Sequence, residues 1–170
     1  MALPPSASVE VSLATPQGSC ALSYAPLDVD SIIHFVRDDS AGAIALFIGT
    51  TRNSFKGKVV TRLEYQAYSK LAIKTMADII REAASGIERS EHQTSTQGDP
   101  CLIRCAIHHR LGFVPVGEPS IVIAVSSPHR RESFVACEFI LENVKRKVQI
   151  WKREYYEGQP DHEAEWKANQ

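Results

Sequence analysis

The sequence predicts a single α+β domain. Apolar runs of strand length alternate with segments whose apolar residues recur at helical spacing. A chain of 170 residues suits one domain. No glycine-rich phosphate-binding fingerprint follows any predicted strand, which argues against a dinucleotide-binding fold. We therefore expect a compact sandwich of helices and strands.

Several segments have strand-like patterns. The run GAIALFIGTTR is almost continuously apolar and ends abruptly in Thr50, Thr51 and Arg52, which is typical of a buried strand that delivers polar residues to its end. The predicted strands span residues 9–14, 20–27, 42–52, 59–68, 101–112 and 120–127. Residues 112–119 contain two prolines and predict a loop.

Three segments are typical of helices. Asp30 is a candidate cap for a helix over 31–39, and Ser69 for the helix that follows it. Ser127 suits the N-cap of a third helix and Pro128 its first position. The apolar stripe of this helix comprises Ala136, Cys137, Ile140, Leu141, Val144 and Val148.

The ends of the chain and one internal segment are polar and rich in turn-forming residues. We expect a flexible tail over 1–8, one catalytic domain over 9–158 and a C-terminal tail over 159–170. Within the domain, 85–100 predicts a mobile polar loop.

Charge and cysteine content narrow the class of protein. The formal net charge of -1 argues against a general nucleic-acid partner. No apolar run is long enough to span a membrane, and the N-terminus lacks the pattern of a signal peptide. The scattered cysteines, Cys20, Cys101, Cys105 and Cys137, predict reduced thiols in the cytosol, with neither a metal site nor a cofactor.

The stretch VKRKVQIWKREYY concentrates cations around Trp151. If the helix continued, Lys145 and Lys152 would share a face, and two lysines without a matching acid favour each other's deprotonation. If the helix ended near Lys147, Lys152 and Glu154 would share one side of a strand, with Arg153 on the other. By composition alone, a solvated basic face is the simpler interpretation.

The stretch SSPHRR predicts an anion site. His129 and Arg130 would lie in the first helical turn, where unpaired N–H groups and the helix dipole also attract anions. The alternative is that both side chains face solvent or pair with acids, and the sequence does not decide between the two.

Other chemically capable residues have simpler explanations. Thr50, Thr51 and Arg52 either line a site or form an ordinary strand exit. His108 and His109 are adjacent on a strand, so they point to opposite faces, and each is best explained as a structural histidine. Cys137 belongs to the apolar stripe and is expected in the core.

Four separated motifs, GAIALFIGTTRN, LEYQAY, HHRLGFVPVGEPSIVIAVSSPHR and VKRKVQIWKREYYEG, together resemble the large, catalytic subunit of molybdopterin synthase. The resemblance runs from about residue 28 to the end. It implies an α/β hammerhead core with a small additional β-rich subdomain. It also implies a homodimer that binds two ubiquitin-like small subunits to give a heterotetramer.

The same resemblance implies a reaction and its residues. Sulfur from the C-terminal Gly-Gly thiocarboxylate of the small subunit would convert cyclic pyranopterin monophosphate to molybdopterin. The catalytic lysines would be Lys145 and Lys152. Substrate contacts would come from His129, Arg130, Arg52, Thr50, Thr51, Arg153 and Glu154. The alternatives are a non-catalytic scaffold that docks a ubiquitin-like partner, and an anion- or RNA-binding module.

Overall fold

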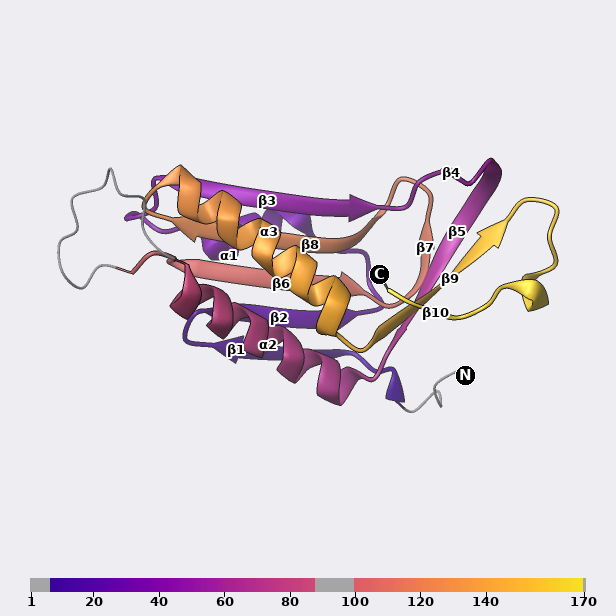
Figure 1. Cartoon of the computed structure of the whole chain (residues 1–170), viewed down its shortest axis with the longest axis horizontal. Helices are drawn as coiled ribbons and strands as arrows, with labels where there is room; N and C mark the ends of the chain where they lie inside the picture. The colour runs from indigo at the N-terminus through magenta and orange to yellow at the C-terminus, as the bar shows by residue number, and fades with distance from the viewer. Residues whose placement is uncertain (1–6, 88–99, 170) are drawn as a thin grey trace.

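The computed structural model describes residues 7–87 and 100–169 and shows two β-sheets with helices on the larger one (Figure 1). Residues 1–6, 88–99 and 170 lie outside the described part, so most of the expected tail over 1–8 and loop over 85–100 cannot be compared. The predicted α+β class is confirmed by this architecture.

The first sheet has five strands in the order β1-β2-β6-β8-β3. The pair β2–β6 is parallel, and the other neighbours are antiparallel. Its strands are β1 (Val11–Thr15), β2 (Gly18–Ser23), β3 (Ala43–Thr50), β6 (Arg104–Arg110) and β8 (Pro119–Ser127). The interior strand β8, between β6 and β3, is buried over almost its whole length because helices cover both faces of the sheet.

Helices α2 (Ser69–Gly86) and α3 (Arg130–Lys147) lie side by side on one face of this sheet, where their apolar stripes form the main core (Figure 1). Helix α1 (Val29–Val36) covers part of the other face through Ile32 and Val36. The stripe predicted for α3 is confirmed, since Ala136, Cys137, Ile140 and Val144 are all buried.

The second sheet is smaller and lies at one end of the first (Figure 1). It has the order β10-β9-β5-β4, and β7 also pairs with β5. Its strands are β4 (Ser54–Phe55), β5 (Lys58–Ala67), β7 (Gly112–Pro115), β9 (Ile150–Tyr156) and β10 (Lys167–Ala168). A tight turn joins β4 to β5 through Lys56 and Gly57, both with positive φ, which glycine adopts without strain.

Three predicted helix starts were wrong by one or two residues. Helix α1 is capped by Asp28, whose side chain accepts a hydrogen bond from the Ser31 amide. At α2 the N-cap is Tyr68, and the Ser69 hydroxyl instead accepts from the Val9 amide. At α3 the N-cap is His129, while the Ser127 hydroxyl donates to the His129 carbonyl.

Segments expected to be irregular also contribute to the sheets. Part of the predicted loop 112–119 is strand β7. The expected C-terminal tail holds a 3-10 helix, Asp161–Glu163, and β10. Ser8, expected in the flexible tail, is buried and accepts a hydrogen bond from the Ala67 amide. The ordered part of the chain is therefore longer than the pattern indicated.

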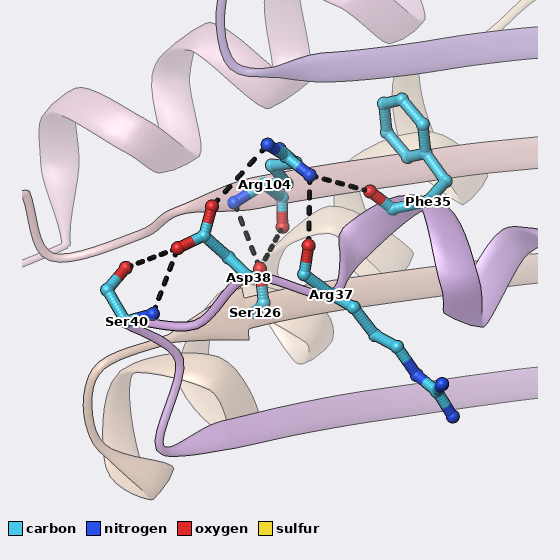
Figure 2. A network of polar contacts seen from close by, with 6 residues as sticks. All are labelled: Phe35, Arg37, Asp38, Ser40, Arg104 and Ser126. Carbon is cyan, nitrogen blue, oxygen red and sulfur yellow. Dashed lines mark hydrogen bonds and ion pairs between the residues drawn. The ribbon is translucent and has the colours of Figure 1, made fainter.

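Arg104 at the start of β6 terminates α1 (Figure 2). Its guanidinium donates to the backbone carbonyls of Phe35 and Arg37 at 3.3 and 2.9 Å and lies 3.4 Å from the Asp38 carboxylate. The Ser40 hydroxyl donates to that same carboxylate. The Arg104 side chain thus donates to carbonyls that α1 leaves without intrahelical partners.

Among the described residues, no helix is both long and apolar enough to cross a membrane.

Candidate active site

The stretch VKRKVQIWKREYY is a corner between helix and strand. Helix α3 ends at Lys147, Val148 is its C-cap, and β9 begins at Ile150. Of the two arrangements that the sequence allowed, the structure has the second. Lys145 therefore lies in the last turn of α3, and Lys152 lies on β9.

The corner brings both lysines to one cavity of about 420 Å³ between the two sheets. Its apolar wall comes mainly from β3, β5, β8 and α3. Apolar lining residues include Phe47, Ile48, Val60, Leu63, Ile121, Leu141 and Val144. Its polar lining includes Thr50, Arg52, Ser54, Tyr65, His109, Ser120, Lys145, Lys152, Glu154 and Asn169. A few polar groups on an apolar wall are typical of a small-molecule site.

Cations outnumber acids in this cavity. Among the described residues that line it, Arg52, Lys145 and Lys152 face one carboxylate, that of Glu154. Lys152 Nζ lies 3.7 Å from Glu154 Oε1, so the expectation that the lysines have no matching acid was wrong for Lys152. The cavity still keeps an excess of positive charge, which suits a small anion.

Glu154 is held from two directions. Its Oε1 pairs with Lys152, and its Oε2 accepts a hydrogen bond from the Tyr156 hydroxyl. Burial and this hydrogen bond raise the pKa of Tyr156 to about 12, so the phenol stays a neutral donor at ordinary pH. Glu154 is thus fixed beside Lys152 and limits where the ammonium group can move.

Arg153 lies on the opposite face of β9 and is absent from the cavity lining, although it was expected as a substrate contact. Its Nε donates to Glu64 Oε2 at 2.5 Å, and its guanidinium carbon lies 4.6 Å from the Trp166 ring centroid. Glu64 Oε2 also accepts from the Tyr155 hydroxyl. Strand alternation explains the separation, because Lys152 and Glu154 point one way and Arg153 the other.

The residues at and after the end of β3 also alternate between the cavity and the protein interior. Thr50 and Arg52 line the cavity. Thr51 is buried, and its hydroxyl donates to the Val114 carbonyl. Arg52 reaches over the β4 turn, with its guanidinium carbon 6.0 Å from the Phe55 ring centroid. Thr51 is therefore a structural residue that ties the exit to β7.

His129 and Arg130 do not reach this cavity. They lie at the N-terminal end of α3, whereas Lys145 lies in its last turn. A helix rises about 1.5 Å per residue, which places His129 roughly 24 Å from Lys145. Both side chains are exposed. Within one chain, the length of α3 therefore separates His129 and Arg130 from Lys145 and Lys152.

The structure adds lining residues that sequence reasoning missed. Tyr65 and His109 are buried and pack edge to face, with ring centroids 4.8 Å apart. Burial lowers the pKa of His109 to about 4, so its ring is neutral at ordinary pH. The alternation in LEYQAY could have indicated Tyr65, since Leu63 and Tyr65 share a face. Nothing in the sequence pattern indicated Asn169.

The cysteines take no part in this cavity. Cys20, Cys105 and Cys137 are buried, and burial raises the pKa of Cys105 to about 12 and that of Cys137 to about 11. In the described part of the chain, no group of three His, Cys, Asp or Glu side chains is placed to hold a metal ion.

The chain is thus an α+β protein with a cavity whose excess of positive charge suits a small anion. The family model described as "MoaE protein" matches residues 22–147, and the chain belongs to this family.

Two relatives and two solved structures show how far the similarity extends. The chain is 44% identical over 149 residues to molybdopterin synthase catalytic subunit 2 of Aedes aegypti, covering 87% of each chain. It is 45% identical over 148 residues to the molybdopterin synthase catalytic subunit of Pyricularia oryzae, covering 87% of this chain and 72% of that one. Molybdopterin synthase from Staphylococcus aureus superposes with a TM-score of 0.71 at 30% identity, covering 86% and 94% of the two chains.

A fourth match concerns the fold alone. The protein–protein complex of subunits 1 and 2 of the molybdopterin-converting factor from Helicobacter pylori contains a chain that superposes with a TM-score of 0.63. Its sequence identity is 17%, and 82% of this chain and 86% of that chain are covered.

Proposed function

We propose that this chain is the catalytic subunit of a molybdopterin synthase. It converts cyclic pyranopterin monophosphate to molybdopterin with sulfur from the C-terminal thiocarboxylate of a ubiquitin-like small subunit. The observation that carries the proposal is the meeting of Arg52, Lys145 and Lys152 in one cavity. The family membership and the names of the relatives support it.

The cavity suits this substrate in size and charge. Small-molecule sites commonly span about 300–1,000 Å³, and this one measures about 420 Å³. Arg52 and the lysines would bind the cyclic phosphate, while Leu63, Tyr65 and Leu141 offer apolar surface to the pterin rings. Thr50 at the rim adds a hydroxyl for the same anion.

The two lysines have different surroundings, and we assign them different roles. Lys145 has no ion pair among the described residues, so its ammonium is available to stabilise charge that develops as the thiocarboxylate reacts, or to move a proton. Lys152 is held by Glu154 and is better placed to bind substrate or a sulfur-linked intermediate. The reacting sulfur comes from the partner, which agrees with the buried cysteines of this chain.

His129 and Arg130 act in this proposal from a second copy of the chain. Strand β3 is an edge strand, and Ile44, Leu46 and Ile48 leave an exposed apolar row along it. Closed dimers are commonly two-fold symmetric, so the same surface of each copy would meet the other. An exposed apolar edge is also a surface that proteins usually cover.

The direction of β3 would bring His129 and Arg130 of one copy to the cavity of the other. The start of β3 lies beside the entry to α3, since the Gly42 amide donates to the Ser127 carbonyl. The end of β3, at Gly49 and Thr50, lines the cavity. Two copies packed antiparallel along β3 would place His129 and Arg130 of one copy beside the cavity of the other. The anion site would then be completed by two chains.

The ubiquitin-like small subunit remains the proposed partner. The family resemblance supports it, as does the likeness in fold to a chain of the Helicobacter pylori two-subunit complex. One small subunit would insert its tail into each cavity, and two would complete a heterotetramer.

We place the reaction in the cytosol. The four cysteines are free, which fits a reducing compartment.

Reconstitution tests the proposal. The purified chain, mixed with thiocarboxylated small subunit and cyclic pyranopterin monophosphate, should form molybdopterin. The Lys145→Ala variant should lose about 100-fold or more in rate, as expected when a group that stabilises developing charge is removed. Lys147→Ala is the matched control, because Lys147 pairs with Glu82 outside the cavity.

Two outcomes contradict the proposal. A wild-type chain that makes no molybdopterin under these conditions is not the catalytic subunit. If it binds the small subunit but calorimetry detects no binding of the pterin, the scaffold alternative is correct. Full activity of Lys145→Ala would remove that lysine from the mechanism.

A further inference from the structure

His109 is a neutral imidazole whose two nitrogens have fixed roles. Its Nδ1 lies 2.8 Å from the Arg110 carbonyl oxygen. A carbonyl only accepts, so Nδ1 carries the proton and donates. Since burial keeps the ring neutral, Nε2 is unprotonated and acts as an acceptor. The ring is almost wholly buried, which prevents it from exchanging these roles with water.

The acceptor nitrogen of His109 orients Asn169. Asn169 Nδ2 lies 3.3 Å from His109 Nε2, and only the NH2 end of an amide can donate there. The Asn169 backbone is fixed as well, because its amide donates to the Ile150 carbonyl at 3.1 Å beyond the last pair of the β9–β10 ladder. Side chain and backbone are therefore both anchored.

This anchoring leaves one group of Asn169 unused. Asn169 lines the same cavity as Lys145 and Lys152. In the described part of the chain, its Oδ1 accepts no hydrogen bond. A carbonyl oxygen held at a cavity wall, with its partner nitrogen committed elsewhere, is a preorganised acceptor.

We propose that Asn169 is a substrate-binding residue whose Oδ1 accepts a hydrogen bond from a ring N–H of the pterin, with His109 as the positioning residue that turns the amide. This inference rests on the proposed function and assigns a binding role to the residue that directly follows β10. The cations of the cavity recognise only the anionic part of the substrate, and Asn169 supplies recognition of the heterocycle. Pterin rings carry several N–H groups and so offer the donors that this acceptor requires.

Calorimetry with two probes tests the proposal. Asn169→Ala should weaken binding of cyclic pyranopterin monophosphate by about 3- to 10-fold, as expected for one neutral hydrogen bond. Binding of inorganic phosphate, which has no ring N–H, should be unchanged. Ala168→Ser is the matched control, since Ala168 is the neighbouring residue, pairs with Trp151 in the β9–β10 ladder and lies outside the cavity lining.

The outcomes are distinguishable. Equal weakening of both probes would mean that Asn169 only supports the cavity wall, and unchanged pterin binding would mean that it makes no contact; either result overturns the inference. A wild-type chain that binds no pterin at all contradicts the proposed function instead. Loss of pterin affinity alone, with an unchanged melting temperature, supports the inference.

Discussion

Arg153 and Lys152 are neighbours in the chain, yet Arg153 pairs with Glu64 on the face of the second sheet that is turned away from the cavity. Lys152 pairs with Glu154 inside the cavity. Two adjacent cations thus belong to two different environments. One stabilises the sheet, and the other is available to a ligand.

Substitution should separate these two roles. Arg153→Ala removes a hydrogen-bonded ion pair that is largely shielded from solvent, and we expect a loss of about 1–2 kcal/mol and a melting temperature lower by about 2–8 °C. Its rate at a temperature where it is folded should stay within about 3-fold of wild type. Lys152→Ala should instead leave the melting temperature nearly unchanged and lower the rate by about 100-fold or more. A large rate loss in Arg153→Ala, without a change in melting temperature, would place Arg153 in the site after all.

Mixed dimers should reveal whether His129 and Arg130 act from the second copy. A Lys145→Ala chain and a chain with both His129→Ala and Arg130→Ala should each be inactive alone. After refolding together, about half of the dimers are mixed, and one of their two cavities has every residue intact. We therefore expect about a quarter of wild-type activity to return.

The control for this experiment uses two variants that damage the same cavity. Chains with Lys145→Ala and Lys152→Ala should not complement each other, because each cavity contains both lysines from one chain. Absence of recovery in the first mixture, with mixed dimers demonstrated by mass, would show that His129 and Arg130 do not act in trans.

His109 should make the stability of the fold depend on pH. Its folded pKa of about 4 lies below the ordinary value of 6.5, so the unfolded chain takes up this proton first as the pH falls. The free energy of unfolding therefore keeps its full value above pH 6.5 and falls by about 3 kcal/mol as the pH falls toward 4. The free energy of unfolding, measured with urea at several pH values across this range, should fall less steeply with pH for His109→Gln than for wild type. The exposed His34 is the control, and His34→Gln should leave the slope unchanged.

Arg104 should stabilise α1 without affecting catalysis. Arg104→Ala leaves the carbonyls of Phe35 and Arg37 without this donor, and we expect a loss of about 1–2 kcal/mol because the side chain is partly exposed. Arg37→Ala is a matched control, since Arg37 contributes only its backbone carbonyl and its side chain points away from the network (Figure 2). Equal melting temperatures for the two variants would contradict this role of Arg104.

Most of the fold could be predicted because the strongest patterns reflect burial. The apolar stripe of α3 and the run of β8 are buried as their patterns indicated. The prediction that β3 is buried was wrong, because β3 is an edge strand that leaves Ile44, Leu46 and Ile48 exposed. Helix starts were less predictable, because α2 and α3 have no side-chain cap and their candidate caps bond elsewhere. The pattern indicates Ser69 as a cap, but its hydroxyl accepts a hydrogen bond from the Val9 amide, far away in the chain.

The site was predictable only in part, because its residues belong to segments that the sequence does not relate. Lys145, Lys152, Arg52, Thr50 and Glu154 are brought together as expected. Thr51 and Arg153 are excluded by strand alternation, which the sequence allowed but did not establish. His129 and Arg130 lie at the opposite end of α3 from Lys145, and Asn169 directly follows β10, a strand of two residues that no pattern indicated.

The connection at Val148 and Gln149 determines which side chains of β9 point into the cavity. These two residues are all that separates α3 from β9. A one-residue insertion there would turn Trp151 and Arg153 toward the ligand and Lys152 outward, because side chains along a strand alternate. The seven-residue interval between Lys145 and Lys152 therefore brings both side chains to the cavity without a continuous helix. This arrangement depends on the number of residues between α3 and β9. Substitutions in this connection should therefore be tolerated far better than insertions or deletions.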